Sequence, residues 1–305
     1  MAGGLFPCVG KSEPMDSVPP VLKGFRFHRQ IAITGFSEIW QAEDLGLGRA
    51  VAVKIFAPIL DANGQVPPFP VAEWRRRFLQ EARIQAGFDH AHIVPVVALA
   101  SLQDGRPAMV MQMMSGSLRL EIGADLFKPG ETEALGEEAR PRAISPARAR
   151  IVLLEVLSAL VFLHGRGIVH RDIKPRNLLL INGPGSRVKL TDFGMAKPPG
   201  EPVSAGPAWF GTPDYISPEQ FADSGLADDR SDIFSLGIVG IRMVTGHLPD
   251  RQRLAAVEDM PAEFKQLLVR MLDMEPSRRP SASQAMERLL AIDLPPGRRE
   301  SMMTG

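Results

Sequence analysis

The sequence is poor in cysteine and tyrosine and has no long uncharged apolar run. Its 305 residues include one cysteine, Cys8, and one tyrosine, Tyr215. A single cysteine cannot form an internal disulfide, which excludes a small disulfide-stapled secreted fold. Residues 1–10 lack a charged-then-apolar leader, so we expect a reducing, cytoplasmic location. The longest apolar stretch, residues 151–164, is shorter than the roughly 20 residues that span a bilayer, so we expect a buried helix and no membrane segment.

The sequence also has no net charge. Its 35 Lys and Arg residues balance 35 Asp and Glu residues. Because no whole-molecule field attracts polyanions, we expect neither nucleic acid nor an anionic membrane as a partner. Apolar residues make up 45% and charged residues 23% of the chain, which excludes a wholly disordered protein. The length predicts about two structural units.

Short β-branched and apolar runs dominate the first third of the chain, at 29–34, 37–43, 50–56, 94–99 and 108–113. One helix is expected among them, at 72–86. Beyond Met114 helical periodicity prevails, with candidates at 146–164, 231–245, 263–272 and 281–290. This order predicts a two-lobed α+β protein. We expect a disordered tail at 1–24, one lobe at 25–114, a second lobe at 115–294 with an exposed insertion at about 115–144, and a C-terminal tail at 295–305.

The most specific pattern is HRDIKPRN at residues 170–177, followed by DFG at 192–194 and SPEQ at 217–220. These motifs resemble the catalytic and metal-binding loops of bacterial Hanks-type, eukaryotic-like Ser/Thr protein kinases. The resemblance covers about residues 25–294. It implies a bilobal protein-kinase fold, with an antiparallel β-sheet lobe carrying one main helix, a mainly helical lobe, and ATP and Mg²⁺ between them.

The resemblance also implies roles for the residues of these motifs. In the family, the aspartate at the Asp172 position orients the substrate hydroxyl and accepts its proton. Lys174 would contact the γ-phosphate, and this lysine is typical of Ser/Thr rather than tyrosine kinases. Asn177 and Asp192 offer hard oxygen ligands, which suit Mg²⁺ bridging the nucleotide phosphates.

Further site residues follow from the same resemblance. Lys54, in the VAVK run at 51–54, would reach the α- and β-phosphates, and Glu81 of the 72–86 helix would pair with it. The alternative is that Glu81 is only a surface charge. Adenine would lie among apolar residues, as a flat aromatic ligand requires: Ile31, Ile39, Ala52, Met111, Met113 and Leu179. The methionines of 108–114 fit core packing equally well.

The phosphate-binding loop departs from the family's pattern. Ala32 and Thr34 replace the first two glycines, Ser37 replaces the third, and only Gly35 remains. Those glycines let backbone N–H groups approach phosphate with no Cβ in the way. We therefore expect weak ATP binding for this family.

Two functions compete on this pattern. We predict ATP-dependent transfer of the γ-phosphate to Ser or Thr hydroxyls of a protein substrate. The alternative is a nucleotide-binding pseudokinase that acts as an interaction scaffold. The altered loop supports this alternative, and so does Gln85, where active relatives more often have an apolar residue. A small-molecule kinase of the same fold is disfavoured by Lys174 and by GTPDYISPE at 211–219.

The segment 192–219 and its surroundings add structural expectations. The resemblance pairs Glu219 with Arg279 and lets Asp232 tie down the catalytic loop. Arg171 would bind a phosphate on this segment, and Ser204 is the candidate phosphosite. The alternative is that Ser204 is an ordinary loop serine.

Overall fold

The computed structural model describes residues 19–60, 70–125, 127, 130–197 and 213–293. Two compact units are present, one within Met1–Arg75 and Val96–Met113, the other within Arg76–Pro95 and Met114–Gly305. Each unit has its own hydrophobic core. Most of the expected tail at 1–24, all of the tail at 295–305, and the predicted phosphosite Ser204 lie outside the described residues.

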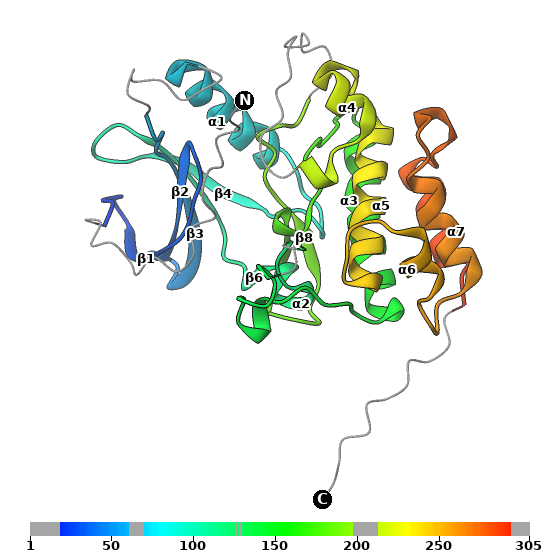
Figure 1. Ribbon diagram of the computed structural model, residues 1–305. Coiled ribbons are helices and arrows are strands. Elements are labelled where there is room, and N and C mark those ends of the chain that lie inside the picture. Colours follow the sequence, from blue (N-terminus) through cyan, green and yellow to red (C-terminus); the bar gives the residue numbers. More distant parts are fainter. Residues whose placement is uncertain (1–18, 61–69, 126, 128–129, 198–212, 294–305) are drawn as a thin grey trace, which may run out of the picture. The chain divides into compact units, whose positions relative to one another are not determined.

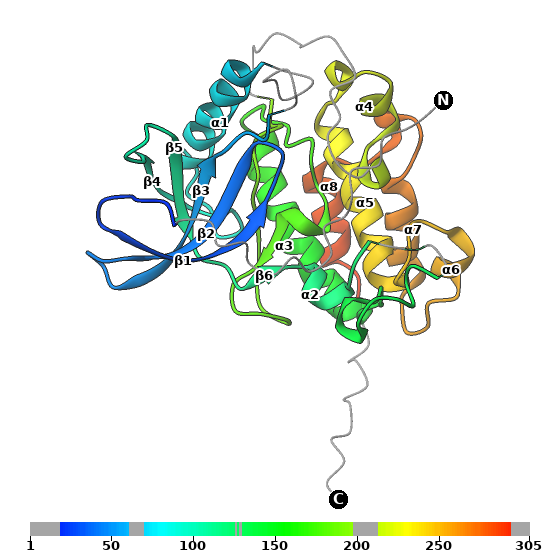
Figure 2. The ribbon, with the colours of Figure 1, turned by 60° about the vertical axis from the view of Figure 1, so that its left-hand side comes forward.

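The first unit contains a five-stranded antiparallel sheet (Figure 1, Figure 2). Its strands are β1 (Phe25–Ile33), β2 (Ser37–Asp44), β3 (Arg49–Phe56), β4 (Val96–Ser101) and β5 (Pro107–Gln112), in the spatial order β1-β2-β3-β5-β4. Val51, Val53 and Ile55 of central β3 face the core of this unit, where they join Trp40. Because strand residues alternate between faces, the intervening residues of β3 point to the opposite face. The expected strands are confirmed to within a few residues.

The fourth strand begins two residues later than the sequence predicts. Ile93 forms a bridge with Leu190 of β8 (Val188–Leu190), and the backbone N–H of Val94 donates to the Leu190 carbonyl at 2.9 Å. These bonds hold Ile93 and Val94 in the second unit. Residues 76–95 therefore belong to the second unit although they lie inside the lobe expected at 25–114. Helix α1 (Val71–Ala86) begins in the first unit and ends in the second.

The second unit is mainly helical. Helices α3 (Pro146–His164) and α5 (Asp229–Thr245) contact each other, α8 (Ala282–Leu290) packs on α3, and α7 (Ala262–Met271) packs on α5 (Figure 2). Shorter helices are α2 (Arg119–Ile122), α4 (Pro218–Ala222) and α6 (Arg251–Ala255). Single 3-10 turns lie at Glu137–Ala139, Pro175–Asn177, Pro213–Tyr215, Ser224–Leu226 and Pro276–Arg278. Among the residues that the structure describes, no helix is both long and apolar enough to cross a membrane.

A small three-stranded sheet accompanies these helices. It consists of β6 (Gly116–Ser117), β7 (Leu178–Leu180) and β8, with β7 in the centre. The sequence does not predict this sheet, because strands of two or three residues are too short to show an alternating pattern. The long helices, in contrast, can be recognised in the sequence by their capping residues. Ser145 caps α3 before Pro146, and Asp228 and Ser231 form a capping box at the start of α5.

The expectation of an exposed insertion at 115–144 is wrong for its first part. Leu118 and Ile122 are fully buried, and their spacing of four residues places both on one side of α2. Arg242 of α5 is also fully buried, and it donates to the carbonyl oxygens of Ile122 at 2.8 Å and Ala124 at 3.1 Å. A buried cation therefore ties this stretch to α5. Residues 130–140 are mostly exposed, as expected.

This arrangement predicts a large effect of Arg242→Met on stability. The change fills similar space, but it removes the arginine donor to the Ala124 carbonyl and one of the two donors to the Ile122 carbonyl, which keeps the Arg142 N–H. It also removes the cation 3.4 Å from Asp125. We expect the free energy of unfolding to fall by about 3 kcal/mol. Arg253→Met, at an exposed arginine of α6, is the matched control and should change it by less than about 0.5 kcal/mol. Equal losses in urea unfolding would contradict the anchoring role.

Candidate active site

The motif at 170–177 forms a loop that brings three predicted site residues together. The Asp172 carboxylate lies 2.8 Å from Lys174 Nζ. Asn177 Nδ2 donates to Asp172 Oδ2 at 2.8 Å and to the Asp172 carbonyl oxygen at 2.9 Å. Asn177 therefore fixes both the side chain and the backbone of Asp172, while Lys174 balances its charge.

The surroundings of Asp172 favour proton acceptance. Burial raises the pKa of the Asp172 carboxyl, Lys174 opposes this effect, and the nearby Asp192 carboxylate adds to it. The net result is a pKa above the ordinary value. A carboxylate with a raised pKa is a stronger base, which suits a group that must take a proton from a hydroxyl.

Asp232 of α5 anchors this loop, as the resemblance predicts. Its fully buried carboxylate accepts hydrogen bonds from the backbone N–H groups of His170 at 2.9 Å and Arg171 at 2.8 Å. It also lies 2.9 Å from His164 Nε2. Burial alone would raise the pKa of Asp232, but the neighbouring histidines and these donors outweigh burial and lower it. The carboxylate therefore stays charged and holds the loop.

Arg171 has a left-handed backbone conformation, with φ at 65°. Gln220 Nε2 donates to its carbonyl oxygen at 2.8 Å, and its own guanidinium donates to the carbonyls of Met195 at 2.6 Å and Ser224 at 3.4 Å. This role of Gln220 was not predicted from the sequence, although Gln220 lies next to Glu219 in the SPEQ motif. The predicted binding of a phosphate by Arg171 stays a prediction.

The DFG segment lies next to the catalytic loop. The backbone N–H of Thr191 donates to the Asn177 carbonyl at 3.0 Å, and Asp192 is the next residue after this hydrogen bond. Asp192 has φ at 68°, a left-handed conformation that aspartate and asparagine tolerate better than most residues. Phe193 is buried against the His170 ring, with centroids 4.8 Å apart.

Asn177 and Asp192 fit the ligand set expected for Mg²⁺. Asn177 uses its Nδ2 for hydrogen bonds to Asp172, so its amide oxygen is the atom left for a cation. In the described part of the chain, no group of three or more His, Cys, Asp or Glu side chains could hold a metal ion. Mg²⁺ does not require one, since it is usually bound by one or two protein ligands together with substrate phosphates.

In the first unit, four predicted site residues share one face of the sheet. Ile39 pairs with Lys54 across β2 and β3, and Ala52 pairs with Met111 across β3 and β5. Directly paired residues share a face, and so do alternate residues of one strand. This face is opposite to the one that carries Val51, Val53 and Ile55 into the core.

The remaining nucleotide-site residues are more scattered. Ile31 lies at an irregularity in the β1–β2 pairing, Gly35 lies between these strands, Met113 directly follows β5, and Leu179 lies in β7 of the second unit. Met111 is buried, so core packing and adenine binding both remain compatible with it.

Lys54 and Glu81 belong to different units, and their ion pair stays a prediction. Glu81 is 2% exposed, which does not fit the alternative of a surface charge. A Cβ atom placed on Gly194 would lie 3.3 Å from Glu81 Oε2. Glu81 therefore lies against the DFG glycine.

Gln85, on the next turn of α1, is fully buried. Its Nε2 donates to the Val94 carbonyl at 2.7 Å. The amide thus ties α1 to the chain segment that leads into β4. The unusual polar residue at this position has a structural role of its own.

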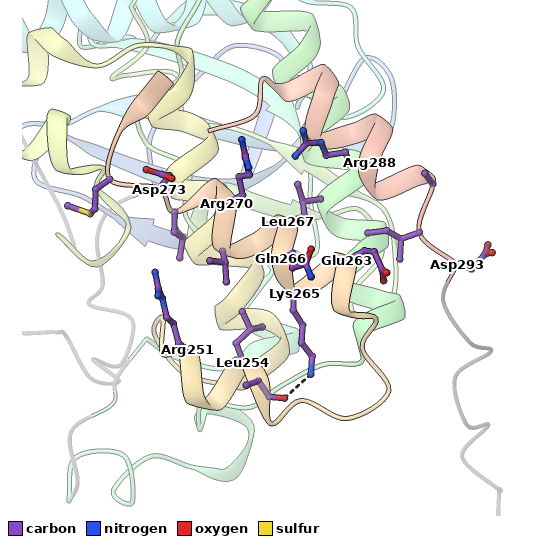
Figure 3. Close-up of a pocket in the computed structure, with 16 residues that line it drawn as sticks. Arg251, Leu254, Glu263, Lys265, Gln266, Leu267, Arg270, Asp273, Arg288 and Asp293 are labelled. Carbon is purple, nitrogen blue, oxygen red and sulfur yellow. Dashed lines mark hydrogen bonds between the residues drawn. The ribbon is translucent and has the colours of Figure 1, made fainter. Parts of the chain in front are cut away.

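A groove of about 1230 Å³ lies elsewhere in the second unit, lined by residues of α6, α7, α8 and the adjoining loops (Figure 3). Its charged lining residues are Arg251, Lys265, Arg270 and Arg288 together with Glu263, Asp273 and Asp293. Positive and negative side chains are mixed, so the groove has no charge preference for one ligand. None of the predicted site residues lines it.

The predicted pair of Glu219 and Arg279 is confirmed. Two guanidinium nitrogens of Arg279 donate to the Glu219 carboxylate at 2.7 and 2.9 Å, and Ser231 Oγ donates to it at 2.6 Å. Burial would raise the pKa of Glu219, but these donors outweigh it and lower the pKa to about 2. The pair fixes α4, at the end of the segment that follows DFG, to Arg279 after the 3-10 turn at Pro276–Arg278, and Ser231 links the same carboxylate to α5.

This pair predicts a stability loss in acid. The pKa of Glu219 is lower in the folded than in the unfolded chain, so its stabilisation is complete above the ordinary value of 4.5 and is lost as the pH falls toward 2. We expect Glu219→Gln to lower the free energy of unfolding at pH 7 by about 2 kcal/mol, once solvent screening is allowed for. The difference from wild type should shrink between pH 5 and pH 3 in urea unfolding. A difference that does not vary with pH would contradict this origin.

The geometry agrees with comparisons to known proteins. The family description that matches the chain is "Protein kinase domain", over residues 25–290. The serine/threonine-protein kinase pkn2 of Myxococcus xanthus is 29% identical over 296 residues, covering 89% of this chain and 32% of that protein. PknJ of Mycobacterium tuberculosis is 33% identical over 236 residues, covering 76% and 36%.

PknA of Mycobacterium tuberculosis is 34% identical over 230 residues, covering 74% of this chain and 47% of that protein. The chain thus spans between about a third and a half of the length of these curated relatives. The match over residues 25–290 includes the catalytic loop, the DFG segment and the Glu219–Arg279 pair. The chain belongs to the protein kinase domain family.

Proposed function

We propose that this chain is an ATP-dependent protein kinase that transfers the γ-phosphate of ATP to Ser or Thr hydroxyls of a protein. The observation that carries the proposal is the arrangement of Asp172, Lys174 and Asn177 in a loop anchored by Asp232. The relatives named serine/threonine-protein kinases support the choice of acceptor. The cytoplasmic location and the lack of a nucleic-acid partner stay predictions.

In the proposed reaction, Asp172 accepts the proton of the substrate hydroxyl as the oxygen attacks the γ-phosphorus. Its raised pKa suits this step, and Asn177 holds it in position. Lys174, 2.8 Å from Asp172, donates to the transferring phosphoryl group. Asn177 and Asp192 would hold Mg²⁺, which when bound would neutralise charge on the nucleotide phosphates. Lys54 on β3 binds the α- and β-phosphates.

The alternative, a pseudokinase scaffold, has less support. A scaffold needs no base, no lysine at the acceptor and no metal ligands, yet Asp172, Lys174, Asn177 and Asp192 are all present. The polar Gln85, which favoured the scaffold, donates a hydrogen bond to the Val94 carbonyl, so it has a structural contact unrelated to scaffolding. The altered phosphate loop bears on ATP affinity and removes none of the groups that act on the acceptor hydroxyl.

The first test removes the base. We expect Asp172→Asn to lower transfer of radiolabelled γ-phosphate to a generic protein acceptor by about 10²–10⁴-fold, since asparagine cannot accept the proton. Lys54→Met should abolish transfer as well. Wild-type transfer to Ser or Thr, identified by phosphoamino-acid analysis, would support the proposal. Wild-type protein that unfolds cooperatively but transfers no phosphate to any acceptor would favour the scaffold.

The second test separates the role of the Asp192 carboxylate from the effect of its left-handed backbone conformation. Asp192→Asn should abolish transfer while the thermal unfolding midpoint stays near wild type, because asparagine also tolerates the left-handed conformation. Asp259→Asn is the matched control, since Asp259 has φ at 56° and is exposed outside the site. It should retain full transfer. Retained turnover in Asp192→Asn would refute the assignment of Asp192 to the metal site.

A further inference from the structure

The loop between β1 and β2 is closed by the side chain of Thr34. Its Oγ1 accepts from the backbone N–H of Ser37 at 2.9 Å and from that of Phe36 at 3.4 Å. The same hydroxyl lies 2.8 Å from Ser37 Oγ, and the backbone N–H of Thr34 donates to the Ser37 carbonyl at 2.8 Å. One side-chain oxygen thus collects the two successive N–H groups at the tip of the loop.

Successive backbone N–H groups that converge on one point form a concave binding site for an anionic oxygen. In this loop that point is occupied by the Thr34 hydroxyl. A phosphate oxygen that used the same donors would have to take its place. The hydroxyl is a weaker acceptor than a charged phosphate oxygen, because hydrogen bonds to ionised acceptors are about twice as strong as neutral ones.

Other contacts hold the loop backbone independently of the Thr34 side chain. The Gly35 carbonyl accepts from the backbone N–H of Ile59 at 2.9 Å, and the Phe36 carbonyl accepts from Ala57 at 3.0 Å. The Phe36 ring stacks on Trp74 of α1, with centroids 4.6 Å apart and planes 12° apart. These contacts leave the N–H groups of residues 36 and 37 in place when the hydroxyl turns away.

The loop also lies close to a residue of the proposed nucleotide site in the same unit. Lys54 Nζ is 5.8 Å from the centroid of the Phe36 ring. Ala32, the other residue that replaces a glycine, lies within β1 and pairs with Ile39. Its methyl group offers no acceptor, so the two replacements have different consequences.

We infer that the Thr34 hydroxyl occupies the backbone donors that bind a phosphate of ATP, and that ATP binds by displacing it. The inference rests on the proposed function and identifies Thr34 as the residue that sets affinity for the phosphate part of the nucleotide. It also revises the reason for weak ATP binding. Thr34 competes through a hydrogen bond and does not act by bulk, and Ala32 contributes little.

The test compares ATP with adenosine, which lacks phosphates, by calorimetry on the whole chain in the presence of Mg²⁺. Thr34→Val has the same shape but no hydroxyl, and we expect it to bind ATP about three- to tenfold more tightly. Its affinity for adenosine should equal that of wild type. Thr34→Ser keeps the oxygen and should keep the wild-type affinity for ATP, and so should Ala32→Gly.

The outcomes separate this inference from the proposed function. If wild type binds ATP and Thr34→Val binds it no better, or binds adenosine more tightly as well, the inference is wrong and the proposed function stands. If Thr34→Val and Ala32→Gly tighten ATP binding equally, bulk and not the hydroxyl limits affinity, which also overturns it. If every folded variant fails to bind ATP, the inference and the proposed function both fall.

Discussion

The buried carboxylate of Asp232 is the constraint on which the rest of the site depends. A charge removed from water is costly unless donors surround it, and here two backbone N–H groups and His164 do so. Because the backbone donors belong to His170 and Arg171, the carboxylate fixes the chain immediately before Asp172. The same bonds offset the left-handed conformation of Arg171, which costs of order 1–3 kcal/mol. The loop is held by charge and not by apolar packing alone.

The first turn of α5 holds two segments through consecutive residues. Asp232 binds the catalytic loop, and Ser231 donates to Glu219 at the start of α4. Gln220, the next residue of α4, donates back to the Arg171 carbonyl at 2.8 Å. The catalytic loop, α4 and α5 therefore form a closed ring of hydrogen bonds. A shift of α4 would break its hydrogen bonds to both the catalytic loop and α5. The segment that follows DFG is therefore linked to the geometry around Asp172.

The sequence predicted the long helices and the motif residues well. It did not predict features that depend on very short strands or on contacts between residues far apart in the chain. Helices such as α3 and α5 carry periodicity and caps over 17 or more residues. The short sheet of β6, β7 and β8 carries no such pattern. The buried Ile122 and Ala124 are bound through their carbonyls by Arg242, more than 100 positions later, and nothing near Ile122 in the sequence reveals that partner. The sequence shows Thr34 at a position where the family's pattern has a glycine, but only the structure shows which backbone groups its hydroxyl binds.

The departures from the family's pattern can be sorted by whether they change the affinity for ATP or the rate of the chemical step. Thr34 and Gln85 are polar residues at positions where the resemblance to the kinase motifs implies a glycine and an apolar side chain, and each makes hydrogen bonds to nearby backbone. Neither contacts the acceptor hydroxyl in the proposed reaction. Groups that act on the transition state change the rate of the chemical step, whereas groups that bind the nucleotide equally throughout change its affinity. We therefore expect the altered loop to change the affinity for ATP, and the residues around Asp172 to determine the rate of turnover. An altered loop alone is no argument for a scaffold.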